Sequence, residues 1–185
     1  MTITDLQWNP KYAGDIDLVY RINTTFQKFI KYLYERKIGI LFIPQLFGKE
    51  NDYTYMHSFL EKNCYILPVK EEYDCYFQQY VIENLDYVVG MRYHSNIFSA
   101  KMGIPFISIA YEQKMSGFME NAELSEYCID INELSEEILR NKFEKVEKDY
   151  IQYKRILKEK IPIWKQESYT STELVDKILV ERNLV

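Results

Sequence analysis

The chain has 185 residues, 47% of them hydrophobic and 28% charged, which is the composition of one globular domain with a sizeable core. Its formal net charge of −5 argues against a general nucleic-acid or anionic-membrane surface, so any anion site must be a local exception. Three scattered cysteines exclude a disulfide framework or a zinc site, and no apolar run reaches the roughly 18 residues of a membrane span. Without a secretory signal, we expect a cytoplasmic protein with no integral membrane segment, nucleic-acid partner, metal or cofactor.

The first third of the chain alternates between helical and strand patterns. Residues 2–8 form a weakly apolar strand candidate, and Asp15 is a suitable cap for a helix that extends to about residue 37. Residues 38–43 are a continuous apolar run, typical of a buried strand. In the loop that follows, Asp52 either caps a helix over about residues 53–62 or contacts a ligand, and capping is the expected role.

The same alternation continues through the middle of the chain. Strands are predicted at residues 64–67, 85–89, 105–110 and 127–129, and helices at residues 71–84 and 115–122 and between residues 95 and 102. This repeated alternation predicts an α/β fold, with a doubly wound parallel sheet of about five or six strands.

Residues suited to chemistry gather between Gly90 and Lys114, after two predicted strands. Arg92 and His94 follow the first of these strands. The second is followed by Tyr111, Glu112 and Lys114. Because ligands of open α/β sheets bind outside the carboxyl ends of strands, we expect a binding site here.

The spacing of Arg92 and His94 constrains the backbone between them. The two side chains share a face only if the chain stays extended through Tyr93, and Ser95 would then be the N-cap of the next helix. A guanidinium fork, an imidazole and free helix amides together suit a small anion with carboxylate or phosphate groups. The alternative is that Arg92 is a surface ion-pair partner and His94 a structural residue.

From Asn132 onward the chain becomes rich in Lys and Glu and shows no strand signal. Apolar residues spaced by three, four or seven between residues 139 and 164 predict a helix with one apolar stripe. Pro162 is expected to kink or break this helix, and a last helix to follow Ser171. We therefore divide the chain into a domain, 1–131, and a helical extension, 132–185, whose stripe packs on the domain or on a partner; a coiled coil is the weaker option.

Several short segments between residues 42 and 119 resemble a known family. No Walker, Gly-x-Gly-x-x-Gly, His-Glu-x-x-His or Gly-x-Ser-x-Gly pattern is present. The polysaccharide pyruvyl transferase family is resembled by Phe42-Ile-Pro-Gln45, Asn51-Asp52, Gly90-Met-Arg-Tyr-His94, Phe98-Ser-Ala100, Gly103-Ile-Pro105, Tyr111-Glu-Gln-Lys114 and Gly117-Phe-Met119. The resemblance covers most of the chain up to about Leu124.

This resemblance implies the C-terminal, donor-binding half of an enzyme with two Rossmann-like halves, similar to the GT-B glycosyltransferases. Such an enzyme transfers pyruvate from phosphoenolpyruvate to a sugar of a cell-surface glycan or exopolysaccharide, as a ketal on a free or lipid-linked acceptor. The Arg-x-His motif of the family falls on Arg92 and His94, which places them at the phosphoenolpyruvate site as catalytic residues. Glu112 stands where Asp is common, and no basic residue lies near Thr4, where many members carry Arg.

Ketal formation needs a proton on the methylene carbon of the donor, deprotonated sugar hydroxyls and a stabilised leaving phosphate. Arg92 could hold the donor, His94 could transfer a proton, and Lys114 could neutralise phosphate. The other expected substrate-binding residues are Gln45, Ser95, Tyr111 and Glu112. Two other functions stay open: a nucleotide-sugar-binding domain of a GT-B glycosyltransferase and a non-catalytic interaction domain. We also expect a separate N-terminal half, or self-association through the stripe.

Overall fold

A computed structural model describes residues 1–46, 51–70 and 73–182. Its strands are all parallel and lie in two small sheets. One sheet pairs β1 (Ile40–Phe42) with β2 (Cys64–Ile66), and the other has the order β3 (Val88–Gly90), β4 (Phe106–Ala110), β5 (Cys128–Asp130). The predicted α/β class with parallel strands is therefore confirmed.

The start of the chain joins the two sheets. The amide of Ile43 donates to the Met1 carbonyl at 2.9 Å, so residue 1 lies beside β1. On the other side, the Thr2 amide donates to Val89 O at 2.9 Å, and the Met91 amide donates to Thr2 O at 2.8 Å. The spatial order is therefore β2, β1, residues 1–3, β3, β4, β5. The strand predicted at residues 2–8 is reduced to a single parallel bridge between Thr2 and Gly90.

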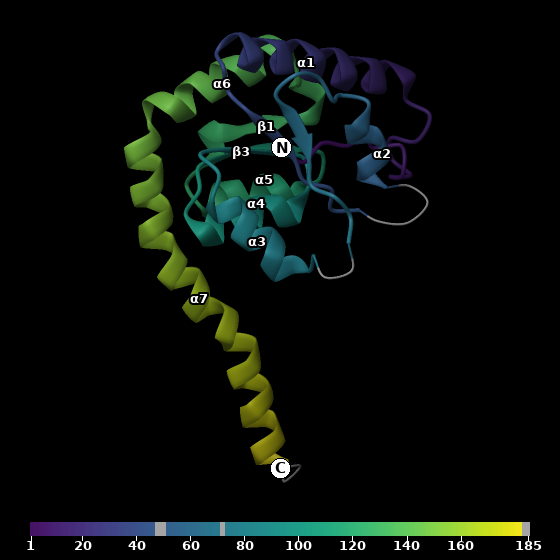
Figure 1. Cartoon of the computed structure of the whole chain (residues 1–185). Coiled ribbons are helices and arrows are strands. Elements are labelled where there is room, and N and C mark those ends of the chain that lie inside the picture. Colours follow the sequence, from purple (N-terminus) through teal and green to yellow (C-terminus); the bar gives the residue numbers. More distant parts are fainter. Residues whose placement is uncertain (47–50, 71–72, 183–185) are drawn as a thin grey trace.

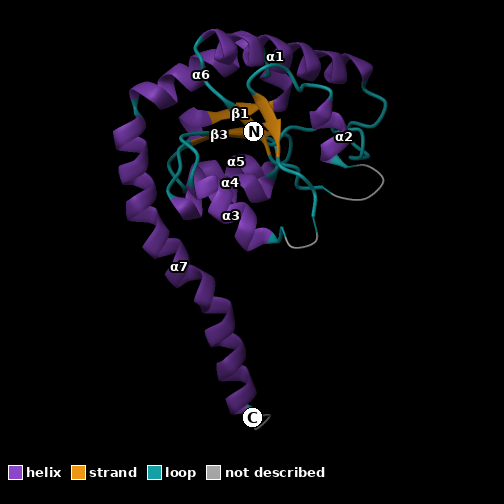
Figure 2. Ribbon diagram, in the orientation of Figure 1, coloured by secondary structure: helices purple, strands orange, loops and turns teal. Residues whose placement is uncertain are grey.

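Helices cover both sides of the strands (Figures 1 and 2). On one side lie α1 (Ile16–Glu35) and α6 (Glu136–Lys148). On the other lie α3 (Cys75–Glu83), α4 (Tyr93–Met102) and α5 (Gln113–Asn121), while the short α2 (Asp52–His57) lies to one side, after β1 in the chain. Single 3₁₀ turns occupy Ser125–Tyr127 and Ile131–Glu133.

The local signals in the sequence explain where α1 and α3 begin. Asp15 caps α1 as predicted, because its Oδ1 accepts a hydrogen bond from the Leu18 amide at 2.9 Å. Asp74 caps α3 in the same way, so this helix begins later than the predicted residue 71. Residues 71–72, and residues 47–50 of the loop after β1, lie outside the described residues.

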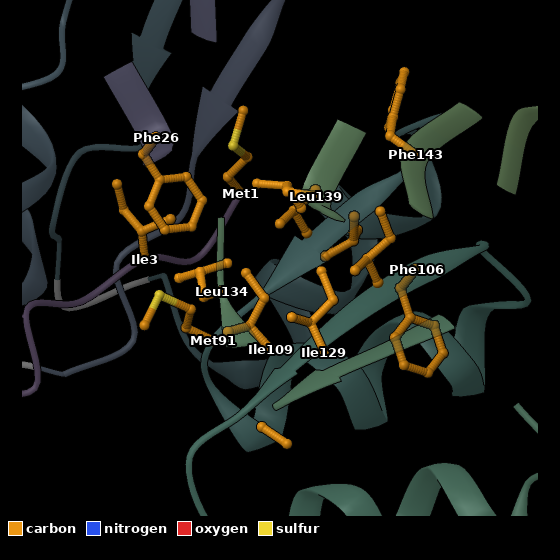
Figure 3. Packing of buried hydrophobic residues seen from close by; sticks show 14 of the residues in the cluster. Met1, Ile3, Phe26, Met91, Phe106, Ile109, Ile129, Leu134, Leu139 and Phe143 are labelled. Atoms are coloured by element: carbon orange, nitrogen blue, oxygen red, sulfur yellow. The ribbon is translucent and has the colours of Figure 1, made fainter. Parts of the chain in front are cut away.

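One hydrophobic core contains buried residues from Met1 to Leu157 (Figure 3). Met1 and Ile3 pack with Ile109 of β4 and Leu139 of α6 in the same buried cluster. Burial of this apolar surface is the main force that holds the strands and helices together. Residues on both sides of position 131 belong to this cluster. The division of the chain at that residue stays a prediction.

The tail differs from the single stripe-bearing helix that was predicted. It forms two helices, since α6 ends at Lys148 and α7 (Tyr150–Glu181) follows Asp149. The Asp149 carboxylate accepts hydrogen bonds from Lys145 at 2.9 Å and from the Tyr127 hydroxyl at 3.0 Å, which lower its pKa and tie the junction to the domain. A break at Pro162 and a separate last helix are wrong, because α7 continues through both positions. The alternative, a kink at Pro162, stays a prediction.

Packing explains why α7 tolerates the proline. A proline inside a helix costs about 3 kcal/mol. Contacts on both sides of Pro162 offset this cost: the Tyr153 hydroxyl donates to Phe106 O at 2.7 Å, and the Trp164 ring lies 5.7 Å from the Phe118 ring. The central residues of the stripe are buried, so it packs on the domain and is not free for self-association; they are Leu139, Phe143, Val146, Tyr153 and Leu157.

Beyond Trp164, α7 projects away from the domain (Figure 1). This part carries exposed apolar side chains, including Tyr169, Leu174, Val175, Ile178 and Val180. In the part of the chain that the structure describes, no helix combines the length and the apolar character that a bilayer crossing requires.

Candidate functional site

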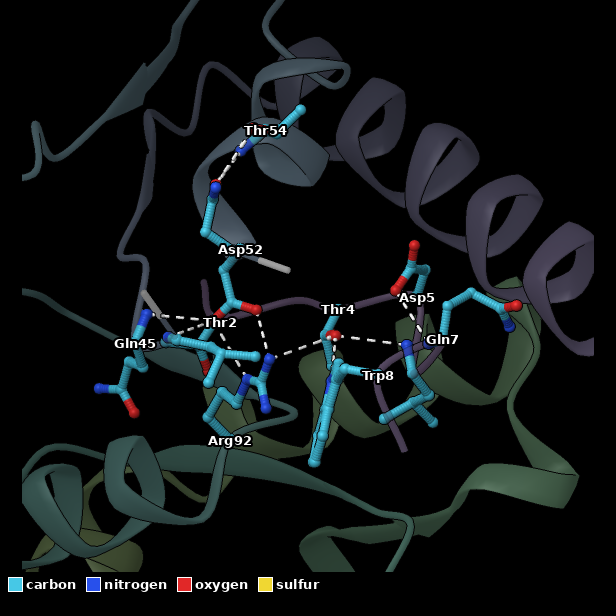
Figure 4. Close-up of polar contacts among 12 residues, drawn as sticks. Thr2, Thr4, Asp5, Gln7, Trp8, Gln45, Asp52, Thr54 and Arg92 are labelled. Atoms are coloured by element: carbon cyan, nitrogen blue, oxygen red, sulfur yellow. Dashed lines mark hydrogen bonds and ion pairs between the residues drawn. The ribbon is translucent and has the colours of Figure 1, made fainter. Parts of the chain in front are cut away.

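Three neighbouring segments of the fold end at the same edge and bring polar residues together (Figure 4). Arg92 follows β3, Tyr111 follows β4, and Thr4 follows the N-terminal segment that runs parallel to β3. The carboxyl ends of parallel strands therefore form the candidate site, as the sequence predicted for Arg92 and Tyr111.

Arg92 is held from several sides. Its side chain is almost fully buried and forms an ion pair with Asp52, in which Nη2 binds Oδ1 and Nε donates to Oδ2 at 3.1 Å. Nη2 also lies 3.4 Å from Thr4 Oγ1, and the guanidinium carbon lies 4.5 Å from the centroid of the Trp8 ring. The Arg92 guanidinium, which was predicted to bind an anion, is thus paired with the Asp52 carboxylate in this structure.

Asp52 is not the cap of α2, so that prediction is wrong. Asn51 is the cap, and its Oδ1 accepts from the Thr54 amide at 2.9 Å. The Asp52 carboxylate instead turns inward, where Oδ2 also accepts from the amides of Gln45 at 3.0 Å and Leu46 at 2.9 Å. A buried carboxylate needs such partners, and Arg92 supplies the compensating charge.

Arg92 and His94 do not share a face through an extended backbone, which corrects another prediction. Arg92 is extended, with φ −100° and ψ 133°, but α4 already begins at Tyr93. As a result Arg92 points inward, whereas His94 is exposed and lies near the rings of Tyr93 and Phe98, each 6.2 Å away. Both residues nevertheless lie at the N-terminus of α4.

Ser95 is buried within the first turn of α4 and is not its cap. The N-cap position belongs to Arg92. The Ser95 hydroxyl donates to Arg92 O at 2.7 Å and lies 2.7 Å from Thr2 Oγ1. It therefore fastens the turn that carries Arg92 to the N-terminal segment, and direct contact with a substrate stays a prediction.

Gly90 allows α4 to start close to β3. A Cβ atom at this position would lie 2.1 Å from Asn96 Oδ1 and 2.8 Å from Ser95 Oγ, both in the first turns of α4. Real Cβ atoms do not approach other atoms so closely, so any larger residue would force the buried side chains of Asn96 and Ser95 to move.

We expect Gly90→Ala to lower the free energy of unfolding by about 1–3 kcal/mol, because the buried side chains of Ser95 and Asn96, which bind Thr2 and Ser108, must move. Gly117→Ala is the matched control: no atom lies within 4 Å of its Cβ, and alanine favours the helix by about 1 kcal/mol. Urea unfolding of both variants tests this. Equal stability changes would show that the close approach at Gly90 has no energetic weight.

The residues after β4 form a more exposed cluster. Lys114 Nζ pairs with Glu112 Oε2 at 2.8 Å, and this hydrogen bond raises the pKa of Lys114. Asn9 Nδ2 lies 3.4 Å from Glu112 Oε1. Burial raises the pKa of the Tyr111 hydroxyl, an effect that the nearby charge of Arg92 partly opposes.

Gln45 lies farther along the same edge. Its Nε2 donates to Gln78 Oε1 at 3.1 Å, whereas its buried Oε1 has no hydrogen-bond partner among the described residues. Its predicted role as an orienting group stays a prediction. Within the described ranges, no three His, Cys, Asp or Glu side chains are placed to hold a metal ion.

The N-termini of α4 and α5 both lie at this edge, and the amides of a helix N-terminus carry a partial positive charge. Their N-cap residues, Arg92 and Glu112, form no side-chain hydrogen bond to the helix amides. The second residue of each helix is basic or titratable, His94 in α4 and Lys114 in α5. Free helix amides beside such groups suit a ligand with carboxylate or phosphate oxygens.

Comparison with known proteins identifies the family of the chain. The family model described as Polysaccharide pyruvyl transferase matches residues 17–113, more than half of the chain. The match includes Arg92 and His94, whereas Lys114 and the tail lie outside it. No curated protein and no solved structure matches the chain.

Proposed function

Because this chain belongs to the polysaccharide pyruvyl transferase family, we propose that it is the C-terminal, donor-binding half of a phosphoenolpyruvate-dependent enzyme. The enzyme transfers pyruvate to a sugar of a cell-surface glycan as a ketal. The observation that carries the proposal is the pair of neighbouring helix N-termini, each without a side-chain cap and each followed by His94 or Lys114.

The donor has two anionic groups, and the two helices offer two places for them. The first-turn amides of α4 with His94, and those of α5 with Lys114, suit a carboxylate and a phosphate. Arg92 lies between β3 and α4 with its Nε and Nη2 bound to Asp52. Donor binding would therefore use its other N–H groups or displace Asp52.

The reaction adds two sugar oxygens to the central carbon of the donor. Two C–O bonds form and the bond from this carbon to the phosphate oxygen breaks. Of the two protons that the sugar hydroxyls lose, one is gained by the methylene carbon and the other leaves with the phosphate as hydrogen phosphate. Positive groups beside the phosphate stabilise the leaving charge, and an imidazole can act as a general acid or base. In this proposal Lys114 and Arg92 stabilise the leaving phosphate, and His94 transfers a proton.

The arrangement of the strands supports the finer part of the proposal, a Rossmann-like doubly wound fold of the GT-B type. The order β2, β1, residues 1–3, β3, β4, β5 equals the 3-2-1-4-5-6 order when the N-terminal segment counts as the first strand. In that arrangement the strand order reverses between residues 1–3 and β3, which is where Thr4 and Arg92 meet.

We expect Arg92→Lys to weaken phosphoenolpyruvate binding about tenfold or more, because lysine lacks the planar fork and a charged hydrogen bond is worth about 1.5–3 kcal/mol. Lys101→Arg, on the exposed surface of α4, is the control and should bind like the parent chain. Calorimetric titration measures both. Equal affinities of the two variants would remove Arg92 from the site.

The same titration separates the other functions. Tight binding of a nucleoside diphosphate without any response to phosphoenolpyruvate would indicate a nucleotide-sugar domain. Binding of neither ligand would favour a non-catalytic interaction domain, with the projecting part of α7 as its surface.

A further inference from the structure

A cavity of about 460 Å³ lies next to the Arg92–Asp52 pair, within the range of about 300–1,000 Å³ typical of small-molecule sites. Asp52 and Thr54 line one side and Asp5 the other, and Thr4 and Trp8 lie between them (Figure 4). Thr4 and Asp52 also bind Arg92, so the cavity adjoins the groups proposed to hold the donor.

The charge of the lining does not suit the donor itself. Of the two carboxylates in the described part of the lining, Asp52 is paired with Arg92, so Asp5 is the one that carries an uncompensated negative charge. The Asp5 carboxylate disfavours a phosphate or carboxylate group on its own side of the cavity. A neutral ligand whose hydroxyls donate hydrogen bonds would be favoured, since carboxylates are strong acceptors.

The carboxylates of Asp5 and Asp52 differ in how many hydrogen bonds they accept. Asp52 already accepts hydrogen bonds from Arg92 and from the amides of Gln45 and Leu46. Among the residues that the structure describes, Asp5 accepts one, from the Gln7 amide at 3.0 Å, although a carboxylate has about four acceptor positions. Asp5 is therefore the group with acceptor positions left for a ligand.

Aromatic groups complete the wall. The Trp8 indole is partly exposed and is fixed in place because Nε1 donates to Thr4 Oγ1 at 3.0 Å. The Tyr55 hydroxyl donates to Asn23 Oδ1 at 2.6 Å. Burial, together with the charge of Asp5, raises the pKa of Tyr55, so this wall stays neutral. Apolar walls with a few convergent acceptors are typical of small-ligand sites.

We propose that this cavity is a subsite for the acceptor, in which the neutral hydroxylated ring of a sugar donates a hydrogen bond to Asp5 and packs beside Trp8. The identification as the acceptor rests on the proposed function, but sugar binding itself does not. The shared residues Thr4 and Asp52 place the ring next to the donor groups, as transfer requires.

The two tryptophans allow a direct test on the full chain. Trp8 lines the cavity, whereas Trp164 packs on Phe118 in the tail contact of α7. In an amide and indole NMR titration without phosphoenolpyruvate, methyl α-glucoside, methyl α-galactoside and methyl α-mannoside are the probes. At least one should shift the Trp8 indole signal and leave that of Trp164 unchanged; Trp164→Phe assigns the two signals.

Charge selectivity gives the second readout. The anionic methyl glucuronide should bind at least tenfold more weakly than its neutral counterpart, and Asp5→Asn should weaken the neutral sugar and reduce this difference. Asp86→Asn, exposed before β3, should change neither value. Ser58→Trp, which fills the exposed rim, should abolish the Trp8 shift without replacing a buried residue.

The outcomes separate this inference from the proposed function. Binding of phosphoenolpyruvate without any response of Trp8 to the three neutral glycosides would overturn the subsite and leave the donor site intact. A Trp8 response with no binding of phosphoenolpyruvate would support a sugar site and remove the pyruvyl donor. Preference for the glucuronide would overturn the subsite as described.

Discussion

Replacing Asp52 by alanine is expected to lower the free energy of unfolding by about 3–5 kcal/mol, one of the two largest effects we predict for this chain. The variant leaves the Arg92 guanidinium buried without its counter-charge. It also removes the acceptor of the Gln45 and Leu46 amides, which fix the loop after β1. Unpaired buried donors cost free energy because they lose water without gaining a partner.

Two further variants isolate the cause of this loss. Asp176→Ala, on the exposed part of α7, is the control and should change stability by no more than about 0.5 kcal/mol. Asp52→Ala combined with Arg92→Met should be more stable than Asp52→Ala alone, since the double variant removes the uncompensated charge. Urea unfolding followed by circular dichroism gives all three values, and additive losses in the double variant would contradict the pairing.

Tyr153→Ala is expected to destabilise the chain by about 3–5 kcal/mol, the range for removal of a large buried ring. Tyr153 is fully buried, and its ring stacks on Tyr127 with centroids 4.4 Å apart. Its hydroxyl also donates to Phe106 O at the start of β4. Loss of these contacts should release α7 from the domain and increase hydrogen exchange at residues 150–164.

The same helix supplies the matched control for this substitution. Tyr169 lies in the projecting part of α7, and about half of its surface is exposed, 49%. Tyr169→Ala should therefore change stability by about 0.5 kcal/mol or less. If both tyrosine variants lost the same stability, the packing of Tyr153 on the domain would not contribute to stability, and the prediction would be wrong.

Much of the fold could be predicted from the sequence because the signals that set it are local. The apolar run at residues 38–43 contains β1, and Asp15 caps α1 as its position before an amphipathic pattern indicated. The order of residue types from Gly90 to Lys114 also placed Arg92 and Tyr111 at strand ends. Periodicity and capping depend only on neighbours along the chain, so they can be read without a structure.

The partners of the site residues, in contrast, depend on segments that are distant in sequence. Asp52 was expected to cap a helix, because its neighbours cannot show that Arg92, forty residues later, lies within reach. The start of α4 at Tyr93, which separates Arg92 from His94, depends on the close approach that Gly90 permits. The continuity of α7 through Pro162 likewise depends on packing, which outweighs the local cost of a proline.

The sequence by itself therefore determined the α/β class, the parallel alternation of elements, the family and the segment that carries Arg92 and His94. Only the tertiary structure decided that the Arg92 guanidinium pairs with Asp52, that His94 is exposed, and that Asp5 lines a cavity next to the Arg92–Asp52 pair. The physical reason is that burial and charge compensation depend on which groups meet in space. The local sequence does not show which polar residues of this chain become neighbours in the folded protein.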